Sequence, residues 1–186
     1  PRIKMTEISY YDEVRKRTIA NSEGLLIGDE LPLLFFIVQV LGADGDRRHL
    51  ARERLSMHSG FEMFDAAASE EAARTAAREA VAMLKAGECP AGRMDVVMEN
   101  GWGGVLVHEA VGHPLEADNI ARKIGAFTGK LGRKVASELF TMVDDGTLPN
   151  MRGTVNFDDE GTPAARNVLI RKGVLEGYMT DILSVG

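Results

Sequence analysis

The residues best suited to chemistry lie in the segment GVLVHEAVGH, residues 104–113, where Glu109 follows His108 and His113 comes five positions after His108. Neutral imidazole is a common zinc ligand, and a carboxylate beside it can take a proton from a water molecule that the metal acidifies. The usual zinc-peptidase motif places its two histidines four positions apart, on one face of a helix. Residues five apart on a regular α-helix diverge by about 140° around the axis. The two histidines can therefore share a metal only if the helix is distorted.

Two distortions would bring the histidines together. One is a π-type turn, which holds more residues per turn and tends to occur at functional sites. The other is an end of the helix near Gly112, after which His113 turns back. Glycine loosens the turn, and Pro114 disfavours a helical conformation at His113, so the sequence favours the second. On spacing alone an alternative stays open, in which His108 is a core histidine and His113 merely ends a helix.

Composition bounds the possible functions. The chain has 186 residues, of which 45% are hydrophobic, enough for one large domain or two small ones. A formal net charge of -6 gives no basic surface, which argues against direct nucleic-acid binding. No apolar run approaches the roughly 20 residues of a membrane span, and the first residues have no signal-peptide core. A single cysteine, Cys89, fits a reducing compartment. We expect a cytoplasmic protein without a membrane association.

The first part of the chain predicts an antiparallel sheet. Residues 3–11 and 13–21 are β-prone runs that we expect to be two short strands separated by polar residues. Residues 31–42 and 47–60 are expected to form two more strands, joined at the tight-turn dipeptide Asp44-Gly45. The apolar density of Leu33–Val40 predicts a strand buried on both faces.

An alanine-rich helix is expected over residues 69–88. Ser69 suits the N-cap, and Gly87 could close the helix in a left-handed conformation. Helical periodicity predicts an inward face made of small side chains and one leucine, namely Ala73, Ala76, Ala77, Ala80 and Leu84. The segment ECPAG then breaks the pattern, and we place a boundary there, between regions 1–88 and 89–186.

The second region predicts a strand over residues 93–100 that leads through a glycine-rich turn into the histidine helix. This order resembles a dinucleotide site, but Leu106 stands where that fingerprint needs a small residue, so nucleotide binding is disfavoured. Lys172-Gly173 separates two β-prone runs and predicts a hairpin. The architecture that follows is α+β: an antiparallel sheet with covering helices, followed by a motif helix and a mainly β segment.

Two acidic doublets in the second region could suggest calcium. They are Asp144-Asp145 and Asp158-Asp159, the latter followed by Glu160. The spacing of a calcium loop is absent, and both groups lead into Gly-Thr, which favours tight bends stabilised by aspartate side chains. We interpret them as structural turns.

Several short motifs of the second region carry a family resemblance. HEAVGH, VASEL, VDDGT, DDEGTP, NVLI and GYM follow one another within residues 99–181, and the chain is similar there to the TldD family, the metallopeptidase branch of the TldD/PmbA proteins called modulators of DNA gyrase. Region 1–88 resembles that family's middle region more loosely. The start at Pro1 and the end at GYMTDILSVG suggest a piece of a longer protein, with region 89–186 a truncated C-terminal domain.

The resemblance implies a zinc-dependent cytoplasmic peptidase that acts on peptides or unfolded polypeptides, usually paired with a TldE/PmbA-like subunit; a homo-oligomer is the alternative. It makes His108 and His113 ligands of Zn²⁺ and Glu109 the catalytic acid/base. The third ligand of the family is a cysteine far downstream, outside this chain, and Cys89 lies in a different context. We expect the piece to lack full activity unless Glu116 or Asp118 substitutes as a ligand.

Two other functions remain open from the sequence. The chain could be a non-catalytic subunit or an inactive fragment that acts by protein–protein interaction in a TldD/TldE-like complex. The older family name also suggests an effect on gyrase, which an acidic chain without a nucleic-acid motif would exert only indirectly.

Overall fold

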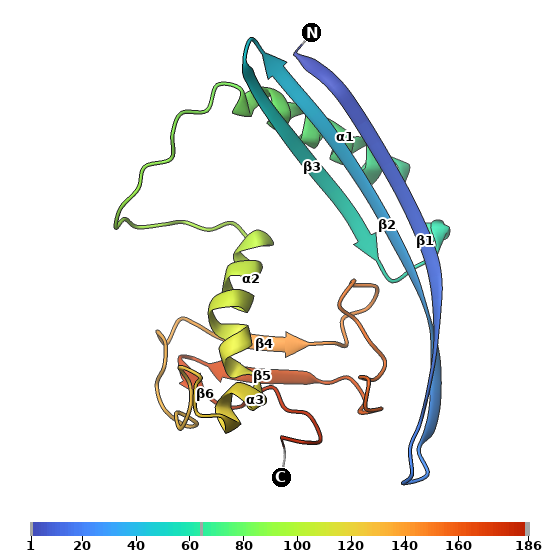
Figure 1. Cartoon of the computed structure of the whole chain (residues 1–186), viewed down its shortest axis with the longest axis vertical. Helices are drawn as coiled ribbons and strands as arrows, with labels where there is room; N and C mark the ends of the chain where they lie inside the picture. Colours follow the sequence, from blue (N-terminus) through green and yellow to red (C-terminus); the bar gives the residue numbers. More distant parts are fainter. Residues whose placement is uncertain (1, 64, 185–186) are drawn as a thin grey trace. The chain divides into compact units, whose positions relative to one another are not determined.

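The computed structural model describes residues 2–63 and 65–184 (Figure 1). The chain divides into two units, and we describe each by itself. The first holds the chain up to Ala91 together with Leu148–Thr154, and the second holds Gly92–Thr147 and the chain from Val155 onward. The expected α+β class is confirmed, because a helix-covered antiparallel sheet is followed by the motif helix and a small antiparallel sheet.

The first unit is built on three long antiparallel strands in the order β1-β2-β3 (Figure 1). They are β1 (Ile3–Ala20), β2 (Leu26–Asp44) and β3 (Arg47–Met57). The prediction of two short strands before residue 21 is wrong, since β1 runs through without a turn. Asp12 and Glu13 pair in register with residues of β2, so the ladder continues past the polar pair that was expected to break it.

The turn and burial of β2 follow partly from its sequence. Asp44 pairs with Arg47, which confirms a two-residue turn, and Gly45 has the positive φ of 59° that such a turn needs. Burial alternates along the strand, with Leu34, Phe36 and Val38 buried and the residues between them half-buried. The prediction of a strand buried on both faces is therefore wrong, because only one face is covered by a helix.

That helix is α1 (Ala66–Met83), which packs on β2 and β3. Its N-cap is Asp65, whose carboxylate accepts a hydrogen bond from the Ala67 N–H at 2.8 Å, so the prediction of Ser69 as the N-cap is wrong. The helix ends at Met83, with Leu84 in a right-handed conformation, and Gly87 lies beyond it instead of closing it.

The inward face of α1 is mainly as expected. Ala76, Ala80 and Leu84 are buried, and Ala73 and Ala77 are partly buried against the same cluster. Small side chains let the helix approach the sheet closely: a Cβ on Gly42 of β2 would lie 2.6 Å from the backbone oxygen of Ala80. The first core is therefore an alanine face pressed on the apolar face of β2.

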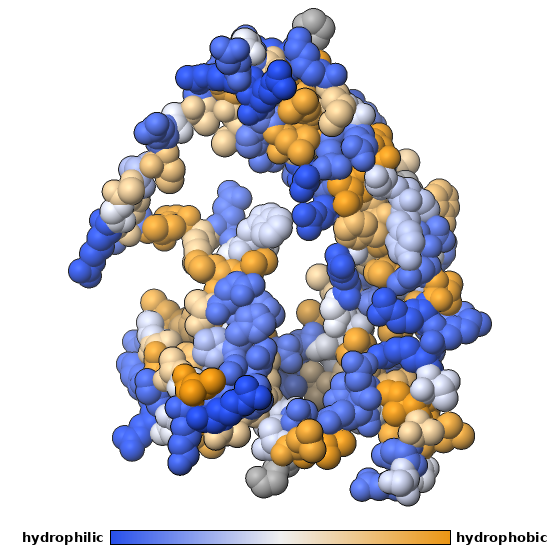
Figure 2. Space-filling view, in the orientation of Figure 1, coloured by the Kyte–Doolittle hydropathy of each residue, from blue (hydrophilic) through white to orange (hydrophobic). Residues whose placement is uncertain are grey.

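The second unit begins with an irregular segment, and the strand predicted over residues 93–100 is wrong. None of the described strands pairs with residues 94–99, and the side chain of Val97 is 98% exposed. Exposed apolar residues of this segment, which precedes α2 in the chain, give orange patches in Figure 2, which has the orientation of Figure 1. The chain then enters α2 (Trp102–Val107), which continues as a π-helical turn (His108–Gly112) and a 3-10 turn (His113–Leu115) before α3 (Ala117–Ala121).

The motif helix is anchored on a small antiparallel sheet of order β4-β5-β6. Its strands are β4 (Met142–Asp145), β5 (Arg166–Arg171) and β6 (Val174–Leu175). Leu115 at the end of the helix is fully buried in one core cluster with Leu169, Ile170 and Leu175. The expected Lys172-Gly173 hairpin joins β5 to β6, with both residues at positive φ.

One further element belongs to the first unit, where a short 3-10 turn (Phe61–Met63) precedes α1. No helix within the described ranges is both long and apolar enough to traverse a bilayer.

Candidate metal site

A π-helical turn places the two histidines on one side of the motif helix. The backbone N–H of His113 donates to the carbonyl of His108, five residues earlier, where a regular α-helix would use a residue four earlier. One turn therefore holds one extra residue, and residues five apart come to lie one above the other. This is the first of the two distortions that the spacing allowed.

The predicted end of the helix at Gly112 is wrong. Gly112 is buried and helical, with φ −57° and ψ −64°, and His113 is helical with φ −54° and ψ −42° although a proline follows. Pro114 instead occupies a last 3-10 turn, where its missing N–H is tolerated, and the chain becomes extended at Glu116. The extra residue is thus absorbed inside the helix and not at its end.

The π turn brings three donor side chains together. The rings of His108 and His113 have centroids 4.5 Å apart at an interplanar angle of 70°. Glu109 Oε2 lies 3.6 Å from His113 Nε2, and a donor atom from each of the three side chains lies within 4.8 Å of the other two. Zinc binds imidazole nitrogen at about 2.0–2.1 Å, so donors this near can share one ion after small side-chain rotations. The residues present fit a zinc ion, and all three are exposed.

Glu116 orients one of the imidazoles. Its Oε1 lies 2.7 Å from His113 Nδ1, and this hydrogen bond, followed by the charges of Glu116 and Glu109, raises the pKa of His113 above its ordinary value. A carboxylate only accepts, so Nδ1 carries a proton in this hydrogen bond, and Nε2, which lies 3.6 Å from Glu109, is the ring nitrogen left for a metal ion. Metal-ligating histidines usually have such a carboxylate on the other ring nitrogen. Glu116 therefore acts on His113 and is not itself in the donor group.

Backbone contacts hold Glu116 in place. The Glu116 N–H donates to the carbonyl of His113 at 3.1 Å, and the next residue's N–H donates to the carbonyl of Met179 at 2.8 Å. The Asn119 side chain also donates to the carbonyl of His113 at 3.2 Å. The chain after the helix is thus tied both to the helix end and to the segment that follows β6.

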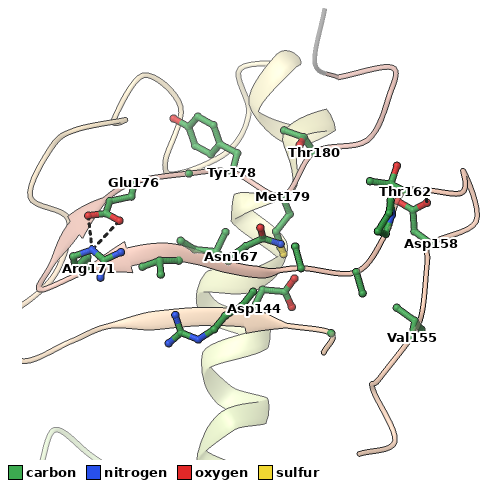
Figure 3. A pocket seen from close by; sticks show the side chains of 18 residues that line it. Asp144, Val155, Asp158, Thr162, Asn167, Arg171, Glu176, Tyr178, Met179 and Thr180 are labelled. Atoms are coloured by element: carbon green, nitrogen blue, oxygen red, sulfur yellow. Dashed lines mark hydrogen bonds and ion pairs between the residues drawn. The ribbon is translucent and has the colours of Figure 1, made fainter. Parts of the chain in front are cut away.

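Two hollows of the second unit share part of their lining, and one of the two includes His108. One, of about 380 Å³, has His108 in its wall; its other lining residues are mostly apolar, namely Gly104, Val107, Gly112, Phe140, Thr141, Met142, Val143, Asp144 and Met179. The other, of about 680 Å³, runs along β5 and is more polar (Figure 3). Asp144 and Met179 line both hollows. Volumes of this size are typical of ligand sites.

The other candidate residues lie elsewhere. Asp118, in α3, is 3.8 Å from the Arg122 guanidinium, and Cys89 is a free, exposed thiol in the first unit. The interpretation of the acidic doublets as turns is confirmed for two of their members. Asp145 accepts from the backbone and hydroxyl of Thr147 at 3.0 and 2.6 Å, and Asp158 accepts from two backbone N–H groups.

Sequence reasoning missed two features of the site. Glu116 was considered as a ligand and not as a hydrogen-bond partner of His113, although a spacing of three residues would have signalled contact on a helix. Asp144 was grouped with the turns, but it lies in β4 and faces both hollows. Nothing in the local sequence separates Asp144 from its neighbour Asp145, because only the strand register does so.

Two imidazoles and a carboxylate on one widened helical turn fit the needs of a metallopeptidase, which uses side-chain metal ligands and a proton acceptor beside them. Comparison with protein families agrees with this class. Residues 1–84 match the PmbA/TldA metallopeptidase central domain, and residues 91–185 match the PmbA/TldA metallopeptidase C-terminal domain. The chain belongs to the PmbA/TldD metallopeptidase family.

Curated relatives are metalloproteases by name. The chain is 43% identical over 182 residues to a metalloprotease TldD homolog of Haemophilus influenzae. The aligned part covers 93% of this chain and 36% of the relative. It is 26% identical over 182 residues to a zinc metalloprotease TldD homolog of Saccharolobus solfataricus, covering 97% of this chain and 40% of the relative. The chain therefore spans well under half the length of these relatives.

Solved structures share the fold. A proposed modulator of a DNA gyrase from Thermotoga maritima superposes with a TM-score of 0.85 at 23% identity, over 99% of this chain and 42% of that one. TldE from Thermococcus kodakarensis superposes with a TM-score of 0.67 at 20% identity, over 94% of this chain and 38% of that one. At these identities the likeness establishes the architecture alone.

Proposed function

We propose that this chain carries the catalytic helix of a zinc-dependent peptidase of TldD type, which hydrolyses peptides or unfolded polypeptides. The observation that carries the proposal is the π turn that gathers His108, Glu109 and His113, with a donor atom of each within 4.8 Å of the others. The metalloprotease names of the relatives support it, one of them a zinc metalloprotease. We further propose that the protein works in the cytoplasm, since a single cysteine suits a reducing compartment.

The roles follow from the geometry. In this proposal His108 and His113 hold the zinc ion, which when bound supplies a Lewis acid that polarises a peptide carbonyl and acidifies a water molecule. Glu109, adjacent to both rings and exposed to solvent, takes the proton of the attacking water at a carboxylate oxygen and passes it to the leaving amine. Glu116 holds the Nδ1 proton of His113 so that Nε2 stays available as a ligand.

His108 and His113 supply only two of the protein ligands that a catalytic zinc ion needs. A catalytic zinc usually has three protein ligands, and Glu109 is needed as the base. Asp118 is paired with Arg122 and Glu116 is bonded to His113, so neither substitutes in this arrangement. We propose that the third ligand comes from outside these 186 residues.

Zinc competition against a chromogenic chelator tests the proposal. The longer protein that contains this segment is expected to bind about one zinc, and the 186-residue chain, which lacks the third ligand, is expected to bind it much more weakly. In both, His108→Ala and His113→Ala are each expected to weaken zinc binding further. Glu109→Gln should bind zinc but support no hydrolysis when introduced into the longer protein that contains this segment. Glu138→Gln, an exposed carboxylate outside both hollows, is the matched control. Zinc binding that survives both histidine substitutions would overturn the proposal.

A second candidate is a role as an assembly subunit, with or without catalysis. It is favoured by β1, an 18-residue strand at the edge of its sheet whose exposed apolar side chains include Ile8 and Val14. We propose a TldE/PmbA-like subunit or a second copy of the chain as the partner. Light scattering coupled to gel filtration, with Ile8→Lys and Val14→Lys in the protein, would show assembly lost without loss of zinc binding.

A further inference from the structure

The hollow beside His108 has a composition that selects one kind of substrate group. We propose that it receives a basic side chain of the peptide, lysine or arginine, with Asp144 as the counter-ion. This inference rests on the proposed function, because it names the substrate class of that same site. It concerns specificity and does not depend on which residues hold the metal.

The hollow beside His108 combines an apolar lining with one carboxylate. His108 and Asp144 both line the hollow, and most of the remaining lining residues are apolar, among them Val107, Phe140 and Met142. A volume of about 380 Å³ equals the share of roughly a dozen water molecules at about 30 Å³ each, which is ample for one long side chain. Lysine and arginine carry an apolar stem and a charged tip, so the stem can lie on the apolar wall while the tip reaches a carboxylate.

Asp144 carries a carboxylate that the described residues leave without a partner. Within residues 2–63 and 65–184, no hydrogen bond or ion pair engages its carboxylate. Its neighbour Asp145 differs, being bonded to Thr147 and lying 3.5 Å from the Arg166 guanidinium. In strand β4, Asp145 is thus bonded to neighbouring residues of the chain, whereas Asp144 lines the hollow.

The larger hollow, which Asp144 also lines, contains two arginines. Its cations are already paired: Arg171 donates to Glu176 at 2.8 Å, and Arg166 lies near Asp145 (Figure 3). In that figure Asp144 lies beside Asn167, its cross-strand partner in β5. Within the described lining of this hollow, each arginine therefore has an acidic partner other than Asp144.

The lining also separates a basic side chain from a free peptide amine. An α-amine sits directly on the backbone and brings no apolar stem, so it would leave the surface of Phe140 and Met142 uncovered. A side chain of four carbons covers that surface and places its charge at Asp144. The lysine or arginine side chain is therefore the occupant that uses both parts of the hollow.

The expected discrimination is modest because Asp144 is exposed. Ion pairs at solvent-exposed positions contribute up to about 1 kcal/mol, which corresponds to roughly three- to fivefold in affinity. The preference should shrink as salt rises from about 0.05 M to 0.5 M, since such pairs are screened.

The test is fluorescence anisotropy with N-acetylated, labelled peptides that differ at one position: lysine, norleucine or glutamate. The metal-free chain is used, so that peptide binding is measured without zinc. Lysine should bind about three- to fivefold more tightly than norleucine, and glutamate more weakly than either. Asp144→Asn should abolish the difference between lysine and norleucine, and Glu138→Gln should preserve it.

Several results would overturn the inference. They are equal affinities for lysine and norleucine in the wild type, no measurable binding of either peptide, or a lysine preference that survives Asp144→Asn. Tighter binding of an alanine peptide with a free N-terminus than of the acetylated lysine peptide would assign the hollow to the amine instead. If the longer protein bound no zinc but the chain still preferred the lysine peptide, the proposed function would be refuted and this inference would stand.

Discussion

Removing one residue from the π turn should leave the metal site intact, whereas adding one should destroy it. Ala110 is exposed and lies between Glu109 and His113, so its deletion removes no core contact. The shortened helix would carry its histidines four apart, separated by about 40° on a regular α-helix. An alanine inserted after Ala110 would place them six apart; with the π turn absorbing one of these residues, they would diverge as residues five apart do on a regular α-helix, by about 140°. The structure thus predicts opposite results from two changes of equal size.

The magnitude follows from the number of ligands retained. Structural zinc sites bind with about 10–16 kcal/mol over four ligands, so one ligand accounts for about 3 kcal/mol, or roughly a hundredfold in affinity. The deletion keeps both imidazoles and should change zinc affinity by less than about tenfold. The insertion removes one imidazole and should weaken binding by about a hundredfold.

The assay is zinc competition with a chromogenic chelator, with circular dichroism to confirm that each variant is folded. His113→Ala in the wild-type background sets the value for a lost ligand. If the deletion weakened zinc binding as much as the alanine substitution does, the π turn would not be what brings the histidines together. An insertion variant that bound zinc as well as the wild type would refute the reasoning equally.

Other predictions follow from single contacts. Glu116→Ala should weaken zinc binding about tenfold, the lower end for lost carboxylate partners of ligating histidines, and Glu116→Gln should restore most of it because an amide oxygen still accepts from His113 Nδ1; equal affinities in a zinc titration would contradict this. Leu115→Ala should lower the free energy of unfolding by about 2–5 kcal/mol in urea denaturation, because the side chain is fully buried. Hydrogen bonds from Thr147 lower the pKa of Asp145, so its stabilising contribution is present above the unfolded-state pKa of about 3.9 and is lost as the pH falls through the lower folded-state pKa. Near neutral pH the free energy of unfolding should therefore be higher for the wild type than for Asp145→Asn, and this difference should shrink in the acidic window. A difference that persisted at the acid end of the window would argue against this contribution.

The sequence predicted elements where a local pattern decides the structure. The Asp44 turn, the alanine face of α1 and the Lys172-Gly173 hairpin all depend on residues close together in the chain. The grouping of His108 with His113 was also predicted, because metal chemistry limited how the two could be arranged.

Three of the errors occurred where a distant neighbour decides the structure. Pairing with β2 carries β1 through Asp12, where the local sequence favoured a break. Only the register of β4 distinguishes Asp144 from Asp145. At the motif itself, Gly112 and Pro114 favoured an early helix end, but burial of Leu115 beneath the helix keeps the chain helical past them, with the extra residue taken up by the π turn. Periodicity along one segment contains none of this information.

The most direct test of the central claim is a long-range proton–nitrogen NMR spectrum of the four histidine rings during a zinc titration. His49 and His58 serve as internal controls, since both lie in the first unit and His58 Nδ1 is 2.9 Å from the carbonyl of Pro32. The account predicts that the Nε2 signal of His113 and one ring nitrogen of His108 shift together and reach an end point at one zinc per chain, while the control rings do not move. Shifts of His108 and His113 at different zinc ratios, or of only one of them, would contradict a shared metal ion.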